Sequence, residues 1–298
     1  MLFVVDVGGP YGYGHFMRCR ELAGQIVERL SWPAAFLLDD ERAADMAKAC
    51  GFKVYWGSLG RAPAEGSGDR ATMAIDGVSS EFDLVVIDIS ARRGLDGGWR
   101  NRWFSPQSVV VMDREDAMAS EADLIIYPGV TGRANNSREG FPPILEGLDY
   151  VILRREVRRY QRLGLTKDID LLAYLHDKKR RNLAAEAAQR NGWRLEMPVQ
   201  LTDKFPELLA RSRVFLSGYG QSFYEAMSLS AYPVAWPISE SHRRDAAAFY
   251  RAIGTSDSCL RSANEVSKLN LDLLSDTWLP SIPDGTAGIV FTMSQVVR

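Results

Sequence analysis

Short apolar runs that alternate with helix-like stretches constrain the fold of this chain more than any other feature. Runs such as SVVVMD and ADLIIYPG are almost continuous in apolar residues and end at Asp or Gly, which is typical of parallel strands buried on both faces. The alternation predicts βαβ units and an α/β fold with open, doubly wound sheets. We expect strands at 2–6, 34–39, 53–56, 82–89, 108–113, 122–129, 168–175, 193–199, 213–218 and 232–238, and helices at 16–30, 41–50, 180–192, 221–231, 242–254 and 285–298.

The alternation pauses in residues 131–149, which are rich in Gly, Asn and Pro, and then restarts. With 298 residues, the chain is long enough for two domains of about 150 residues each. We therefore expect an N-terminal domain at 1–150 and a C-terminal domain at 151–298, with the last helix able to pack back on the N-terminal domain. Two Rossmann-like domains of this kind face a cleft, and ligands bind at the carboxyl ends of the strands.

Composition excludes several classes of function. Lys and Arg number 36 and Asp and Glu 38, so the chain lacks the basic excess that a nucleic-acid partner usually requires. We expect no membrane span and no signal peptide, because apolar runs stay short and the start lacks a basic segment. The three cysteines are widely spaced and form no Cys/His cluster, so we expect no disulfide framework, no metal site and a cytoplasmic location.

A glycine-rich loop, VGGPYGYGH, follows the first expected strand and leads into a helix. Glycines such as Gly12 and Gly14 let the backbone approach a ligand closely. His15 stands at the expected helix start, where free N–H groups favour anions and oppose an imidazolium, so a neutral His15 can accept a proton from water. The alternative is that His15 only caps the helix and the glycines only form a turn. The spacing is not G-x-G-x-x-G, so no nicotinamide cofactor is indicated.

Three aspartates, Asp6, Asp88 and Asp113, end expected strands and therefore point toward the same edge of the sheet. There they can orient a sugar or His15. Many strand-end aspartates, however, only form turns or caps, and that alternative stays open here.

A second loop-to-helix junction, SGYGQSFYEA, occupies residues 217–226. Its glycines, together with Gln221 and Ser222, can offer N–H and hydroxyl groups to phosphate oxygens. Glu225, about one turn into the helix, can accept hydrogen bonds from ribose hydroxyls. The alternative is ordinary capping by Ser222, with Glu225 on a solvated face.

Two further features have ordinary interpretations. The basic segment LHDKKRRN at 175–182 can neutralise a diphosphate, but a solvated run of charge explains it better. His242 can contact a ligand, although a surface histidine beside two arginines is the simpler account.

The segment GYGHFMRCRELA resembles the G-x-G-H-x-x-R-C-x-x-L-A signature of the UDP-sugar hydrolase of pseudaminic acid biosynthesis. The match covers every fixed position of the signature: Gly12, Gly14, His15, Arg18, Cys19, Leu22 and Ala23. Later stretches, including FDLVVID, ADLIIYPG and YVILRREV, look like landmarks of that family in the same order, so the resemblance spans nearly the whole chain.

The resemblance implies a glycosyltransferase-B fold in which the N-terminal domain holds the sugar and the C-terminal domain holds UDP. Water attacks the anomeric carbon of the sugar, UDP leaves, and neither a metal nor another cofactor is needed. His15 would be the base. The resemblance further implies a sugar site with Asp6, Gly12, Gly14, Arg18 and Asp88, and a nucleotide site with Gly218, Tyr219, Gly220, Gln221, Ser222 and Glu225.

The nucleotide side departs from the family pattern. The turn reads Tyr219-Gly220-Gln221-Ser222 where the family has Gly-Gly-Ser-Thr, and a tyrosine there can obstruct or reshape the phosphate pocket. Ser90 replaces a family tyrosine, and LHDKKRRN lacks paired glycines. We therefore interpret the chain as a divergent nucleotide-sugar hydrolase of nonulosonic acid or surface-polysaccharide biosynthesis. The alternatives are a glycosyltransferase with a nucleotide-sugar donor and a non-catalytic nucleotide-sugar binding protein.

Overall fold

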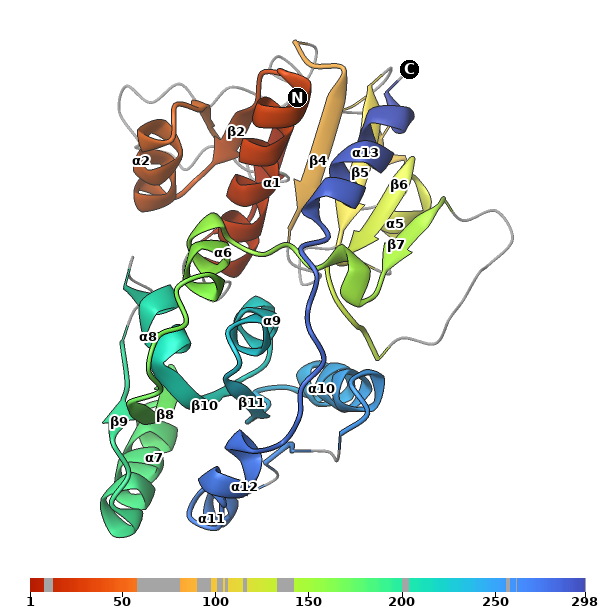
Figure 1. Cartoon of the computed structure of the whole chain (residues 1–298). Helices are drawn as coiled ribbons and strands as arrows, with labels where there is room; N and C mark the ends of the chain where they lie inside the picture. Colours follow the sequence, from red (N-terminus) through yellow and green to blue (C-terminus); the bar gives the residue numbers. More distant parts are fainter. Residues whose placement is uncertain are drawn as a thin grey trace, which may run out of the picture. The chain divides into compact units, whose positions relative to one another are not determined.

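The computed structural model describes residues 1–7, 13–57, 81–89, 98–100, 104, 107–114, 117–132, 142–199, 204–255, 258–260 and 262–297 (Figure 1). The chain forms two compact units. Unit 1 comprises Met1–Pro128, Asn136–Ile152 and Asp284–Arg298, and unit 2 comprises Gly129–Asn135 and Leu153–Pro283. The expected boundary at residue 150 lies close to the change from unit 1 to unit 2 between Ile152 and Leu153. The C-terminal segment Asp284–Arg298, however, belongs to unit 1.

Unit 1 contains a parallel sheet in which, within the described ranges, seven strands follow the order β3-β2-β1-β4-β5-β6-β7. Its strands are β1 (Leu2–Val5), β2 (Ala35–Leu38), β3 (Lys53–Trp56), β4 (Leu84–Asp88), β5 (Ser108–Met112), β6 (Leu124–Tyr127) and β7 (Ile144–Glu146). Six of these were expected from their apolar runs. The short strand β7 was not, because its three residues lie in the Gly- and Pro-rich stretch that reads as a loop.

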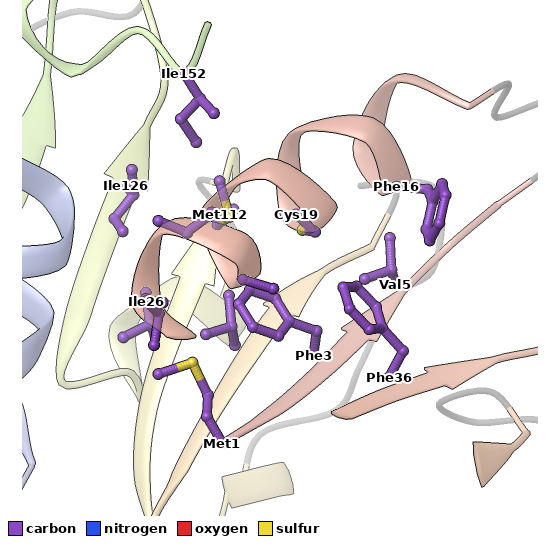
Figure 2. Packing of buried hydrophobic residues seen from close by; sticks show 14 of the residues in the cluster. Met1, Phe3, Val5, Phe16, Cys19, Ile26, Phe36, Met112, Ile126 and Ile152 are labelled. Atoms are coloured by element: carbon purple, nitrogen blue, oxygen red, sulfur yellow. The ribbon is translucent and has the colours of Figure 1, made fainter. Parts of the chain in front are cut away.

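The helices of unit 1 pack against this sheet through apolar faces. They are α1 (Gly14–Leu30), α2 (Glu41–Ala49), α5 (Ala117–Ser120), the 3-10 helix η2 (Leu148–Tyr150) and α13 (Thr286–Val296). Helix α1 lays Phe16, Cys19 and Ile26 over Phe3 and its neighbours in the core (Figure 2). Each of these side chains is fully buried, and burying a Phe or Ile contributes about 1.5–3 kcal/mol. The position of α1, and with it that of His15, is therefore set by the core.

The last helix, α13, closes the same core. Ile289, Val290 and Met293 are buried in it, and α13 lies beside α1 and β6 (Figure 1). The helix begins just after Gly285, whose N–H donates to the carbonyl of Val151 at 2.8 Å. A Cβ at residue 285 would overlap the backbone of Asp149, so only glycine allows this approach.

Unit 2 contains a second parallel sheet with the order β11-β10-β8-β9. Its strands are β8 (Ile169–Tyr174), β9 (Leu195–Glu196), β10 (Ser212–Ser217) and β11 (Tyr232–Ala235), and its helices are α6 (Arg155–Gln161), α7 (Lys178–Asn191), α8 (Phe205–Arg211), α9 (Gln221–Ser228), α10 (Glu240–Ala252), α11 (Ala263–Val266) and α12 (Leu271–Ser275). Because all described pairings in both sheets are parallel, the α/β prediction is confirmed.

Several elements of unit 2 differ from the expectations, and the short helices α6, α11 and α12 were not expected. Strand β9 has two residues rather than the seven of WRLEMPV, because the carbonyls of Met197 and Pro198 accept hydrogen bonds from Arg181 instead of from a neighbouring strand. Helix α8 was not expected. It places Pro206 in its first turn, where the missing N–H of proline costs nothing.

Candidate functional site

Three side chains of the signature lie on one face of α1. His15, Arg18 and Cys19 occupy positions i, i+3 and i+4, which share a face of an α-helix. The face meets the end of β4, the strand next to β1, where Asp88 is the last residue. The spacing H-x-x-R-C thus brings three hydrogen-bond donors to one carboxylate.

Asp88 receives all three donors. Its Oδ1 accepts from Nδ1 of His15 and from Nη2 of Arg18, both at 2.6 Å. Its Oδ2 accepts from Nε of Arg18 at 2.6 Å and from Sγ of Cys19 at 3.3 Å. Arg18 therefore binds Asp88 through two parallel hydrogen bonds, the strongest geometry for an arginine–carboxylate pair.

The charge of Asp88 is stabilised inside the protein, where its side chain is fully buried. Burial alone would raise the pKa of the Asp88 carboxyl, but the charge of Arg18 and the hydrogen bonds from Arg18 and His15 outweigh it and hold that pKa well below its usual range. Burial and the nearby Asp88 raise the pKa of the Cys19 thiol well above its usual range, so the thiol keeps its proton and donates it. Asp88 is thus a carboxylate that only accepts.

His15 is oriented by this carboxylate. Because Asp88 is an acceptor, Nδ1 of His15 carries the hydrogen of the 2.6 Å bond, and Nε2 is the nitrogen left to accept a proton. The side chain is 24% exposed. The capping alternative is wrong, since the N-cap is Tyr13 and no side chain caps the first turn.

The other two strand-end aspartates differ in exposure. Asp6 is 1% exposed, and its N–H donates to the carbonyl of Asp88 at 3.1 Å. The Asp113 side chain is 37% exposed and approaches Nη1 of Arg18 at 3.4 Å. Asp113 also has a φ of 58°, a left-handed conformation that costs energy in most residues and is found often at functional sites. Asp113 is therefore the carboxylate of the three that a ligand can reach.

The glycines of the first loop stay largely untested. Gly12 lies outside the described residues. Gly14 is the first residue of α1, and a Cβ there would meet nothing within 4 Å, so packing does not require glycine at this position.

In unit 2, β10 leads through Gly218, Tyr219 and Gly220 into α9. Gly220 is the N-cap, with a φ of 146°, and no side chain caps the helix. The alternative of capping by Ser222 is therefore wrong, because Ser222 lies within the helix. The N-terminus of a helix carries a partial positive charge that favours an anion.

Tyr219 holds its ring within unit 2. Its φ of 105° is unusual for a residue with a side chain, and glycine would adopt it freely. The hydroxyl donates to the carbonyl of Val130 at 3.0 Å and lies 2.7 Å from the hydroxyl of Tyr224. The ring packs edge-on against Phe223 and Phe249. These contacts hold the side chain against Val130, α9 and α10 of the same unit.

Glu225 is not on a solvated face. It is 1% exposed, and both of its oxygens accept from Arg154, at 2.6 Å each. Its role toward a ribose stays a prediction, and it would require Glu225 to share its oxygens with Arg154. The sequence pattern does not indicate Arg154, because this partner lies 71 positions away in the chain.

The basic segment fits neither of its two interpretations fully. Arg180 donates to the carbonyls of Trp236 and Pro237, and Arg181 donates to three carbonyls that include those of Met197 and Pro198. The two arginines therefore join loops of unit 2, while Lys178 and Lys179 are exposed. The other histidine considered, His242, lies in the first turn of α10, where its N–H donates to Ser239.

The described residues contain no group of three or more His, Cys, Asp or Glu side chains placed to hold a metal ion. Among the helices in the described ranges, none is long and apolar enough to cross a membrane.

Comparisons with solved structures identify the fold. MurG of Acinetobacter baumannii superposes with a TM-score of 0.59 at 11% identity, over 99% of both chains. The glycotransferase of kitacinnamycin gives a TM-score of 0.62 at 11% identity, over 100% of this chain and 99% of the other. The UDP-GlcNAc 2-epimerase of Neisseria meningitidis, bound to UDP-GlcNAc, gives 0.55 at 10% identity, over 99% of both chains. No protein-family model and no curated protein sequence matches the chain. At these identities the likeness establishes the fold: the chain has the glycosyltransferase-B fold, with its two doubly wound Rossmann-like units.

Proposed function

We propose that this protein hydrolyses a UDP-linked sugar, with His15 as the base. The observation that carries the proposal is the 2.6 Å contact between Asp88 and Nδ1 of His15, which leaves Nε2 to accept a proton. In the reaction, Nε2 takes a proton from water as the water oxygen bonds to the anomeric carbon. The bond from that carbon to the β-phosphate oxygen breaks, and UDP leaves with the electron pair.

Three observations support a nucleotide sugar as substrate. The neighbour from Neisseria meningitidis is bound to UDP-GlcNAc, and a further neighbour, HepE from Anabaena, is in complex with UDP and glucose. The N-terminus of α9 favours the negative charge of the diphosphate, which must be stabilised as UDP leaves. The complete H-x-x-R-C signature favours a sugar of the pseudaminic acid type, processed in nonulosonic acid or surface-polysaccharide biosynthesis.

The test is UDP release from the UDP-diacetamido sugar that precedes pseudaminic acid. His15→Ala should lose about 10²- to 10⁴-fold in rate, the usual contribution of a general base. His176→Ala is a matched control, because His176 is exposed and makes its ring contact with Tyr174 in unit 2. Equal release by wild type and His15→Ala would remove His15 from the mechanism.

A glycosyltransferase is the second candidate, favoured by the Tyr219 turn and by the transferase among the structural neighbours. The same Nε2 would then take its proton from the hydroxyl of an acceptor. UDP release that needs no acceptor would count against this candidate. A binding protein without turnover is a third, favoured by the pairing of Glu225 with Arg154. Calorimetry with UDP and CDP, followed by a turnover assay, would identify it.

A further inference from the structure

We propose that Arg18 is a positioning residue, which sets the tautomer and orientation of His15 by holding both oxygens of Asp88. The inference rests on the proposed function, in which Nε2 of His15 takes the proton. It replaces the interpretation of Arg18 as a ligand of the sugar.

The guanidinium is already occupied. Arg18 is 9% exposed, and its Nε and Nη2 donate to the two oxygens of Asp88. Its Nη1 edge faces Asp113, at 3.4 Å. Two of its three nitrogens are bonded to Asp88 and the third lies near Asp113, so burial and pairing both argue against direct recognition of a sugar.

Arg18 also decides which bond His15 can make. Nη2 of Arg18 lies 3.3 Å from Nδ1 of His15, near enough to donate to it if Asp88 did not hold the arginine. In that arrangement Nδ1 would accept, the hydrogen would move to Nε2, and the ring would no longer be a base toward water. Because Nε and Nη2 of Arg18 are hydrogen-bonded to Asp88, they do not donate to Nδ1 of His15. Oδ1 of Asp88 accepts from Nδ1 instead, and this bond keeps the hydrogen on Nδ1.

The groups that face Asp88 come from several elements. His15, Arg18 and Cys19 come from α1, Asp113 follows β5 and approaches through Arg18, and Asp6 follows β1 and donates its backbone N–H to the carbonyl of Asp88. Among the side chains that contact Asp88 in the described residues, Arg18 is the permanent cation. A lysine at position 18 keeps this charge but not the two parallel bonds, because an ammonium is not a planar fork.

The experiment is ¹⁵N NMR of histidine-labelled protein, which needs no substrate. The chain has three histidines, so His15 can be assigned by its loss in His15→Ala. Thermal unfolding reports whether each variant is folded, because the other two histidines lie in unit 2 and do not report on unit 1. In the neutral ring of wild-type His15, Nδ1 should carry the hydrogen and Nε2 should not. Asp88→Asn should move the hydrogen to Nε2, because Asn can present its NH2 group to Nδ1 and Arg18 is released.

The comparison that decides the matter is Arg18→Lys against Arg29→Lys. Arg29 lies in the last turn of the same helix and donates to Gln25, away from Asp88. Arg18→Lys should show a mixture of the two His15 tautomers, whereas Arg29→Lys should keep the wild-type spectrum. Arg18→Met is a second variant, which removes both the positive charge and the two parallel hydrogen bonds to Asp88. If both Arg18 variants are folded and keep a single Nδ1-protonated ring, the proposal is wrong.

Kinetics add an independent readout. If UDP-sugar hydrolysis is found, Arg18→Lys should lower kcat about 10- to 100-fold and leave KM nearly unchanged, as expected for a residue that orients a catalytic group. A rise in KM with unchanged kcat would restore the sugar-ligand interpretation and overturn the proposal. A spectrum as expected, without hydrolysis of any UDP-sugar tried, would refute the proposed function and leave the role of Arg18 standing.

Discussion

The buried pair between Arg154 and Glu225 should dominate the stability of unit 2. The two side chains are 6% and 1% exposed, and the guanidinium also lies 5.9 Å from the ring centre of Phe205. Arg154→Met would leave the Glu225 carboxylate without its cation in a site that water does not reach. Breaking one partner of such a pair costs about 3–5 kcal/mol. Because about 1.4 kcal/mol is a factor of ten, amide exchange limited by opening of unit 2 should become roughly 10²- to 10⁴-fold faster.

Hydrogen exchange with mass spectrometry can measure this loss, since peptides from β8 and β10 report on unit 2 while peptides from β4 and β5 provide an internal reference in unit 1. Arg159→Met is the matched control, because Arg159 is exposed on α6, the helix that follows Arg154, and should change stability by less than about 0.5 kcal/mol. The double variant Arg154→Met with Glu225→Leu should recover most of the loss, because apolar side chains replace a buried pair at little cost. Two results would refute this reasoning. One is amide exchange in unit 2 of Arg154→Met that is as slow as in the wild type. The other is exchange in the double variant that is as fast as in Arg154→Met.

Three further predictions concern other contacts. Gly285→Ala should destabilise unit 1 by about 1–3 kcal/mol, because its Cβ would overlap the backbone of Asp149. Gly288→Ala, in the helix that follows, meets nothing within 4 Å and should be neutral or stabilising, and thermal unfolding of the two variants tests this. Tyr219→Phe should lower the free energy of unfolding by about 0.5–1.5 kcal/mol, because it removes the hydroxyl contacts to Val130 and Tyr224. Urea unfolding measures this, and an unchanged midpoint would show that those contacts contribute nothing. Burial lowers the pKa of Lys167 to about 8 from its ordinary 10.5, so the unfolded chain binds more protons between these values, and stability should rise from pH 8 toward 10.5. Lys167→Met should lack this rise, and equal pH dependence in both proteins would contradict the assignment.

The strands show why the prediction of the fold succeeded so widely. Buried parallel strands must be apolar on both faces, so Leu84–Asp88 and Ser108–Met112 stand out as runs without any knowledge of their neighbours. Strand β7 and helix α8 were missed because short elements carry too few residues for a periodic signal, and their stability comes from packing.

The candidate site was predictable in its residue types and only partly in its roles. The i, i+3, i+4 spacing of His15, Arg18 and Cys19 already places them on one face of a helix, and this signal could have identified Cys19 as a donor. The spacing does not show which residue they face. Arg18 was therefore assigned to the sugar, whereas the structure gives its guanidinium to Asp88.

The sequence by itself determined the alternation of strands and helices, the place of His15 at a helix start, and the residue types of both glycine-containing turns. These are local properties, since periodicity, glycine and helix signals act over a few residues. Only the tertiary structure decided the pairs: Asp88 with His15 and Arg18, and Glu225 with Arg154, across separations of 70 residues or more. A carboxylate can equally bind a sugar, cap a helix or hold an arginine. Which of these it does depends on the order of strands in the sheet and on burial, which removes the competition of water and leaves the facing side chain as the partner.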